Sequence, residues 1–260
     1  MIILLHSSKT MRKTPINKEH VGQPALLEEA IKLNDYLLNL SINEISKKMS
    51  VSKKLATQTQ ELIHHWSDDK VIPIAAADCF LGDIYSGLQS PNWNDKQRKF
   101  ANNHLYIISG LYGLLKPLDG IRPYRLEMAY KLAPGPYKDL YEYWGDKIAK
   151  LIPKSGVIIN LSSIEYSKVV TPYFEKGRII SPYFMTVNKL TNEPTFVTVH
   201  SKIARGAFAN WLIISEADKI TDLPNFNMLG YSYSKLLSTP NKPVYICEEF
   251  QGLGLSLRLK

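Results

Sequence analysis

Short apolar runs that alternate with longer amphipathic segments are the feature that most restricts the fold of this chain. Residues 2–5, 105–108 and 157–161 are continuous apolar runs of a length typical of buried strands. Segments with helical spacing of apolar residues separate these runs. The sequence therefore predicts an α/β protein, with a mixed sheet flanked by helices.

Other segments extend this pattern to the end of the chain. We expect helices over residues 24–40, 42–49, 53–66, 95–104, 139–151 and 202–217, and further strands over 71–80, 178–187, 195–201 and 244–247. Pro73 makes 71–80 an edge or interrupted strand, and 188–194 is expected to connect an antiparallel pair. No repeat or linker divides the sequence, so residues 1–260 are expected to form one domain.

The charge balance favours an anionic partner. The chain has 32 Lys and Arg residues against 24 Asp and Glu, a formal net charge of +8. Residues 150–210 alone hold eight of these cations and three carboxylates. Nucleic acid is the first candidate partner, and a generally basic surface is the alternative.

Cysteine content and hydropathy indicate the compartment. Cys79 and Cys247 lie far apart and form no metal-binding spacing. The apolar start of the chain is too short for a signal peptide, and no run approaches the length of a membrane span. We therefore expect a cytoplasmic protein without a membrane partner.

Familiar catalytic and metal-binding motifs are missing from the sequence. It contains no phosphate-binding loop motif, dinucleotide-binding fingerprint or nucleophile elbow. Glu61 and His64 form a single Glu-x-x-His pair, whereas a di-iron bundle needs two such pairs and two further carboxylates. No metal and no cofactor are expected.

The turn between the helices over 42–49 and 53–66 suggests a phosphate contact. Ser52 is placed to cap the second helix, and Lys53 and Lys54 lie beside the positive end of its dipole. Such a helix end can hold a backbone phosphate without reading bases. The alternative is that two amphipathic helices simply need a turn.

Polar turns follow two of the expected strands. Lys9 and Thr10 come after the first strand, and Ser162 and Ser163 follow the strand over 157–161. If these strands are parallel neighbours, both turns face one crevice at their carboxyl ends. Two unrelated polar loops are the alternative.

A segment rich in Gly, Pro and cations, "SGLYGLLKPLDGIRPYRLEM" (109–128), begins where the strand over 105–108 ends. Its glycines permit close backbone approach and its prolines stiffen the path. Lys116, Arg122 and Arg125 suit phosphate or carboxylate groups. Tyr124 can stack on a base or pack in the core, and Glu127 can act as a general base or orient Arg125.

Several motifs together resemble one known family. They are Lys9-Thr10, "GDIYSGL" (82–88), the segment 109–128, "DLYEYWGD" (139–146), "NLSSIEY" (160–166) and "KIARG" (202–206), and they resemble the YaaA family of peroxide-stress proteins. The resemblance implies a cytoplasmic bacterial protein that limits free intracellular iron under hydrogen peroxide. It also implies a basic cleft, a helix–hairpin–helix element within residues 42–66, and binding to double-stranded DNA.

The chain departs from the family pattern in two places. Helix–hairpin–helix turns usually carry a glycine, and residues 48–52 contain none. The usual Ser-Pro-Ala-Lys-Thr is replaced by Ser7-Ser8-Lys9-Thr10, so only the Lys-Thr pair transfers.

Two hypotheses follow for the function. In the first, the protein binds double-stranded DNA or another phosphate-bearing ligand through Lys9, Thr10, Ser52, Lys53, Lys54, Lys116, Arg122, Arg125, Ser162, Lys168, Lys202 and Arg205. In the second, it is an enzyme acting on a nucleotide or damaged base in the same cleft, with Glu127, Tyr124 and Lys9 as catalytic candidates. An iron-binding protein is a third possibility, which the ligand count disfavours.

Overall fold

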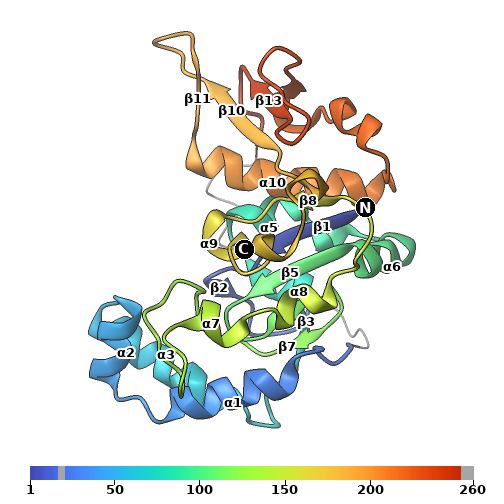
Figure 1. The fold of residues 1–260 in the computed structure, drawn as a ribbon. Helices are drawn as coiled ribbons and strands as arrows, with labels where there is room; N and C mark the ends of the chain where they lie inside the picture. Colours follow the sequence, from blue (N-terminus) through green and yellow to red (C-terminus); the bar gives the residue numbers. More distant parts are fainter. Residues whose placement is uncertain (17–20, 253–260) are drawn as a thin grey trace.

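A five-stranded sheet forms the centre of the protein (Figure 1). The computed structural model describes residues 1–16 and 21–252. Its strand order is β6 (Gly113–Leu115), β5 (Leu105–Ser109), β1 (Ile2–His6), β8 (Ile158–Asn160) and β9 (Ile179–Ile180). All neighbouring strands are parallel except β5 and β6. The apolar runs predicted as strands are β1, β5 and β8, and they lie side by side.

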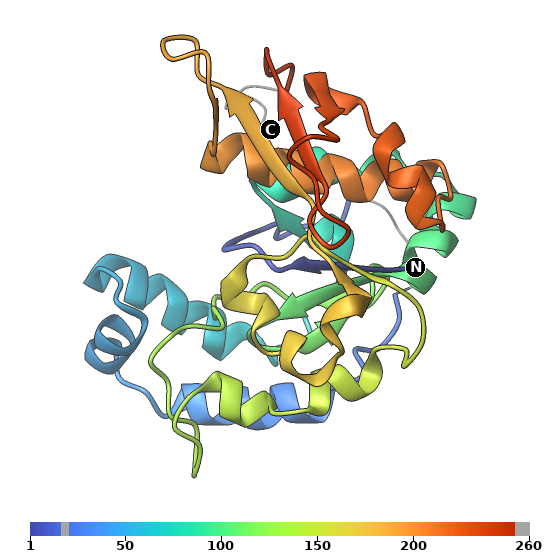
Figure 2. The ribbon, with the colours of Figure 1, turned by 45° about the horizontal axis from the view of Figure 1, so that its top comes forward.

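A second, four-stranded sheet lies beyond α10 (Thr198–Ile214), which separates it from the central sheet in Figures 1 and 2. Its order is β11 (Pro194–Thr195), β10 (Tyr183–Val187), β13 (Val244–Cys247) and β12 (Tyr231–Tyr233). Two short pairs join β2 (Thr10–Met11) to β4 (Phe80–Leu81) and β3 (Ile74–Ala75) to β7 (Gly120–Ile121). The strands are thus divided among several sheets instead of one.

One hydrophobic core connects both larger sheets. It includes Leu4 and Ile107 of the central sheet and Phe184 and Tyr245 of the outer sheet. Helices cover it on several sides: α1 (Leu27–Leu38), α2 (Ile42–Met49), α3 (Lys53–His65), α4 (Ala76–Cys79), α5 (Asp83–Leu88), α6 (Asp95–His104), α7 (Leu140–Trp144), α8 (Lys147–Leu151) and α9 (Ile164–Ser167). Short 3-10 turns cover residues 90–92, 171–173, 176–178, 220–225 and 228–230. The predicted mixed α/β class is confirmed.

The α2–α3 hairpin lies at the lower left of the molecule in Figure 1, whereas β10 and β11 lie at its top. Ser41 and Glu44 form a capping box at the start of α2. Ser50 ends α2 in the left-handed conformation, with φ of 53°, and so takes the place where a glycine is usual. Ser52 then caps α3 by accepting from the Leu55 amide, as expected from the sequence.

Several predicted elements differ from the structure. The strand expected over 178–187 is divided, because β9 belongs to the central sheet and β10 to the outer sheet. Residues 71–80 form two short strands with the helical turn α4 between them. The helix expected over 139–151 is split into α7 and α8 because Gly145, with φ of 46°, cannot continue a right-handed helix. The strand expected over 195–201 ends at Thr195, and the helix begins at Thr198 instead of residue 202.

The first turn of α10 was missed because of its β-branched residues. Thr198 and Val199 favour strand, but this preference amounts to less than about 1 kcal/mol per residue. Both side chains are exposed, and Ser201 is the first buried residue of the helix.

Candidate ligand-binding site

A pocket of about 540 Å³ lies at the carboxyl end of the central parallel strands. Leu4 of β1 is paired with Tyr106 of β5 on one side and with Asn160 of β8 on the other. The chain passes from β1 to β5 and later returns to place β8 on the opposite side, so strand order reverses here. Ligands bind at such switch points in open α/β sheets. The lining residues are His6, Ser7, Ser8, Lys9, Thr10, Leu81, Gly82, Asp83, Ile84, Tyr85, Glu127, Ser163, Glu165, Tyr166 and Lys202.

The two polar turns singled out in the sequence meet in this pocket. Because β1 and β8 are parallel neighbours, Lys9, Thr10 and Ser163 all follow the carboxyl ends of these strands and line the same pocket. Ser162 is buried, and its hydroxyl donates to Asn160 Oδ1 at 2.6 Å. Ser163, and not Ser162, therefore lines the pocket.

Glu127 is held in the pocket by two close contacts. Lys9 Nζ lies 2.8 Å from Glu127 Oε2, and the Tyr130 hydroxyl donates to Oε1 at 2.6 Å. Arg125 Nη2 lies farther away, at 3.9 Å from Oε1. The Lys9 side chain is 61% exposed whereas that of Glu127 is only 10% exposed. Lys9 thus bridges solvent and a buried carboxylate, an arrangement suited to proton transfer at a bound ligand.

Tyr130 was not singled out in the sequence, although it contacts the predicted general base directly. Burial, and then its hydrogen bond to Glu127, raises the pKa of the Tyr130 phenol. It therefore stays protonated and donates to Glu127. Its place three residues after Glu127 is the only sequence signal for this contact.

Arg125 approaches the same carboxylate from within the protein. Its Nε atom is buried and has no hydrogen-bond partner among the residues that the structure describes. One role considered for Glu127 was to orient Arg125. Lys9 and Tyr130 both lie closer to the Glu127 carboxylate than Arg125 does, so the contact with Arg125 is the weakest of the three.

His6 is a second residue that sequence reasoning missed. Its Nδ1 accepts from the Ser163 amide at 3.2 Å, and its ring stacks on Tyr166 with centroids 4.8 Å apart. Burial, followed by the charges of Arg205 and Lys202, lowers the pKa of His6 to about 3. The ring is therefore neutral at physiological pH. Since Nδ1 accepts, Nε2 carries the proton and can donate to a ligand.

The pocket contains charges of both signs. Asp83, Glu127 and Glu165 contribute carboxylates, and Lys9 and Lys202 contribute ammonium groups. Glu165 also accepts from the Ala129 amide at 3.0 Å. A lining of this kind suits a ligand with both an anionic group and hydrogen-bond donors better than it suits a uniform polyanion.

Other predicted residues lie outside the pocket. Arg122 donates to the carbonyl oxygens of Val71 and Trp66 and thereby anchors the loop after α3. The Tyr124 hydroxyl lies 2.6 Å from Ser109 Oγ, and its ring packs edge-on against Tyr112 and Phe80. Of the roles open to Tyr124, the structure shows packing in the core. Ser52, Lys53, Lys54, Lys116, Lys168 and Arg205 do not line the pocket either.

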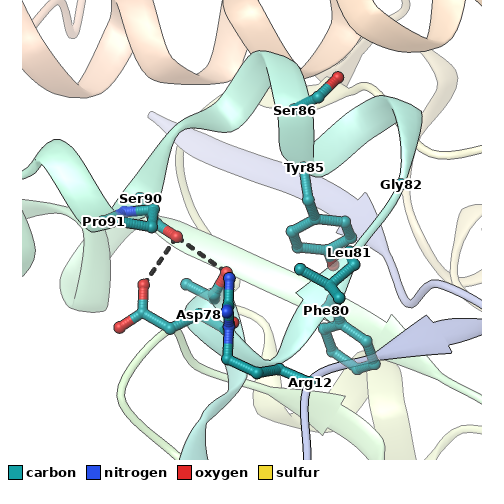
Figure 3. Close-up of a pocket in the computed structure, with 10 residues that line it drawn as sticks. Arg12, Asp78, Phe80, Leu81, Gly82, Tyr85, Ser86, Ser90 and Pro91 are labelled. Atoms are coloured by element: carbon teal, nitrogen blue, oxygen red, sulfur yellow. Dashed lines mark hydrogen bonds between the residues drawn. The ribbon is translucent and has the colours of Figure 1, made fainter. Parts of the chain in front are cut away.

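A second, smaller pocket shares a wall with the first. It has a volume of about 130 Å³ and, like the larger pocket, is lined by Leu81, Gly82 and Tyr85. Ser90 Oγ lies 2.8 Å from both the Ala77 carbonyl oxygen and Asp78 Oδ1 (Figure 3). Asp78 also forms a buried ion pair with Arg98 at 3.0 Å. These contacts fix the segment that leads into α5.

Within residues 1–16 and 21–252, no group of three or more His, Cys, Asp or Glu side chains is arranged to hold a metal ion. Among the helices of the described chain, none has the length and apolar character to cross a bilayer.

Sequence comparisons place the chain among known proteins. It is 45% identical over 258 residues to a UPF0246 protein of Salinispora tropica, covering 99% of this chain and 98% of that protein. It is 37% identical over 234 residues to a UPF0246 protein of Roseobacter denitrificans, covering 87% and 90%. The family model described as peroxide stress protein YaaA matches residues 1–237. The resemblance seen in the motifs is therefore confirmed, and the chain belongs to the YaaA family of peroxide stress proteins.

Proposed function

We propose that this protein acts in the cytoplasm during the response to hydrogen peroxide, where it binds double-stranded DNA and helps to limit free intracellular iron. Membership of the YaaA family supports the role in peroxide stress. The net charge of +8 supports attraction to a polyanion. The DNA contact proposed here depends on one feature, the exposed start of α3.

The α2–α3 turn combines the features of a backbone phosphate contact. Ser52 fixes the first turn of α3, a 13-residue helix whose N-terminal dipole end is positive. Lys53 and Lys54 are exposed beside it, and Lys47 and Lys48 lie in the last turn of α2. Such contacts position a protein on DNA without reading its sequence.

The salt dependence of DNA affinity tests this proposal. Each neutralised phosphate contributes about 0.9 to the slope of log K against log salt. Replacing both lysines, Lys53→Gln with Lys54→Gln, is expected to weaken binding and to reduce the slope by about 2. The matched control is Lys154→Gln with Lys219→Gln, which removes the same charge from exposed lysines elsewhere.

A flat salt slope for the unaltered protein, or the same loss of affinity in both double variants, would contradict the DNA contact. The iron role has its own readout. Cells that produce the unaltered protein should hold less chelatable ferric iron after peroxide, measured by electron paramagnetic resonance, than cells with the Lys53 and Lys54 variant. Equal amounts of chelatable iron in the two strains would show that the control of iron does not depend on DNA binding through Lys53 and Lys54.

A second candidate function is an enzyme acting on a nucleotide or damaged base. The contact of Glu127 with Lys9 and Tyr130 at the edge of a 540 Å³ pocket favours it. Binding a DNA backbone requires no buried carboxylate of this kind. In this role Glu127 takes a proton from the ligand, and Lys9 stabilises the charge that results.

The two functions are separable by one substitution. Glu127→Gln keeps the size of the side chain and removes its charge, so turnover of a nucleotide or damaged-base panel should be lost while DNA affinity stays the same. The absence of turnover by the unaltered protein across that panel would count against the enzyme.

A further inference from the structure

Two cations on α10 stand out because they lack partners. Lys202 and Arg205 lie three residues apart and so share one face of the helix. Neither forms a hydrogen bond or an ion pair among the residues that the structure describes. Lys202 is exposed and lines the large pocket, whereas Arg205 is half-buried.

An unpaired guanidinium in a half-buried position is unfavourable. Burial lowers the pKa of Arg205, and the neighbouring Tyr183 offsets only part of this effect. Buried charges are normally paired or hydrogen-bonded. An anion placed beside Arg205 would offset this cost.

His6 completes the set of donors. His6 and Lys202 both line the pocket where β1 ends, and Arg205 lies three residues after Lys202 on the same face of α10. The charges of Arg205 and Lys202 both help to lower the pKa of His6. The ring is oriented by the Ser163 amide on Nδ1, which leaves the Nε2 proton available. The site thus offers two full positive charges and one neutral donor.

We propose that Lys202, Arg205 and His6 bind the phosphate of a nucleoside monophosphate whose sugar and base occupy the pocket beside Glu127. Two positive charges match a terminal phosphate monoester, which carries close to two negative charges at neutral pH. A volume of about 540 Å³ lies within the range of pockets for ligands of this size. The carboxylates of Glu127 and Glu165 can accept from N–H and O–H groups of the base and sugar.

The same carboxylates explain why a single nucleotide fits better than a duplex. Asp83, Glu127 and Glu165 line the pocket and repel any further phosphates brought close to them. A nucleoside monophosphate has its only strong negative charge at one end. The inference rests on the second candidate function, because it names the ligand of the same pocket.

Calorimetric titration tests the phosphate site. The ligands are the four ribonucleoside 5′-monophosphates, the matching nucleosides, ribose 5-phosphate and inorganic phosphate, all at equal ionic strength. At least one monophosphate is expected to bind about tenfold or more tightly than its nucleoside, since the phosphate makes charge-assisted hydrogen bonds. Arg205→Gln and Lys202→Gln should each remove most of this difference.

Matched controls keep the test specific. Lys219→Gln removes an exposed cation that does not line the pocket and should leave nucleotide affinity unchanged. Arg205→Lys keeps the charge and should retain part of the affinity. Thermal unfolding of each variant checks folding, and removal of an unpaired cation is expected to leave the midpoint unchanged or raised.

The inference is overturned if no monophosphate binds above the ionic-strength control, if nucleosides bind as well as monophosphates, or if Arg205→Gln binds like the unaltered protein. Affinity for double-stranded DNA is measured in parallel. If the unaltered protein binds DNA but no nucleotide, this inference is overturned and the proposed DNA binding is not. If it binds a nucleotide without turnover, the inference is supported and only the proposed enzyme activity is contradicted.

Discussion

The hydroxyl of Tyr130 donates a 2.6 Å hydrogen bond to the Glu127 carboxylate, whose other oxygen lies 2.8 Å from Lys9 Nζ. The phenol therefore holds from within the protein a carboxylate that Lys9 reaches from the solvent side. A hydrogen bond to a charged group contributes more to stability than one to a neutral group. Tyr130 is thus a positioning residue for Glu127.

Substitution of Tyr130 should reveal this charged hydrogen bond. Tyr130→Phe is expected to lower the free energy of unfolding by about 1.5 kcal/mol or more. The control is Tyr141→Phe, which removes a 2.9 Å bond to the neutral Glu165 carbonyl and should cost about 1 kcal/mol or less. Urea denaturation measures both. Equal losses would mean that the Glu127 charge adds nothing to the bond.

The packing of α5 against α10 leaves no room for a side chain at Gly206. A Cβ atom placed there would lie 1.8 Å from the Ile84 carbonyl oxygen. Gly206→Ala should therefore destabilise the protein by about 3 kcal/mol or more, because the two helices would have to move apart. This change would also disturb the pocket wall that α5 and α10 supply.

Gly177 provides the matched control for this substitution. A Cβ atom at Gly177 would meet nothing within 4 Å. Gly177→Ala should leave the thermal midpoint unchanged or slightly raised, since alanine restricts the unfolded chain. No loss of stability in Gly206→Ala, or a similar loss in both variants, would contradict the role of the close contact with Ile84.

Some of the fold was predictable because its signal is local. The apolar run over residues 2–5 and its partners over 105–108 and 157–161 correspond to β1, β5 and β8. The cap by Ser52 was also visible in the sequence. Capping and the burial of a continuous apolar run depend on neighbouring residues, so a single sequence contains this information.

The remainder depends on contacts between distant segments. His6 and Ser163 are 157 residues apart, and no local pattern predicts that the Ser163 amide donates to the His6 ring. The aromatic ring of Tyr124 is of a type that can stack on a base, but its hydroxyl contacts Ser109 in the core. The division of the strands among several sheets likewise depends on pairing between segments that are far apart in the sequence.

The neutral state of His6 predicts a pH effect on stability. Its pKa falls from 6.5 to about 3 on folding, so the folded state binds fewer protons than the unfolded state between these values. Stability from this group is therefore fully present above pH 6.5 and is lost as the pH falls toward 3. The expected slope is about 1.4 kcal/mol per pH unit.

Comparison with His6→Asn isolates this contribution, because asparagine keeps an acceptor for the Ser163 amide but does not titrate. The free energy of unfolding of the unaltered protein, relative to that variant, should rise with pH between about 4 and 6. His64→Asn changes an exposed histidine on α3 and is the control. A difference that stays constant over this range would contradict a neutral, buried His6.

Asp119 should produce the opposite dependence. Burial raises its pKa from 3.8 to about 6, even though Oδ2 accepts from the Lys116 amide at 2.8 Å. The folded state therefore binds the proton more tightly, and stability relative to Asp119→Asn should fall as the pH rises from about 4 to 6. The expected change is about 3 kcal/mol, at about 1.4 kcal/mol per unit of pKa.

Asparagine preserves the acceptor, and Asp218→Asn is the exposed, charge-matched control. Denaturant unfolding across this pH range measures the effect, and a relative stability that rises with pH would show that Asp119 is stabilised as a carboxylate.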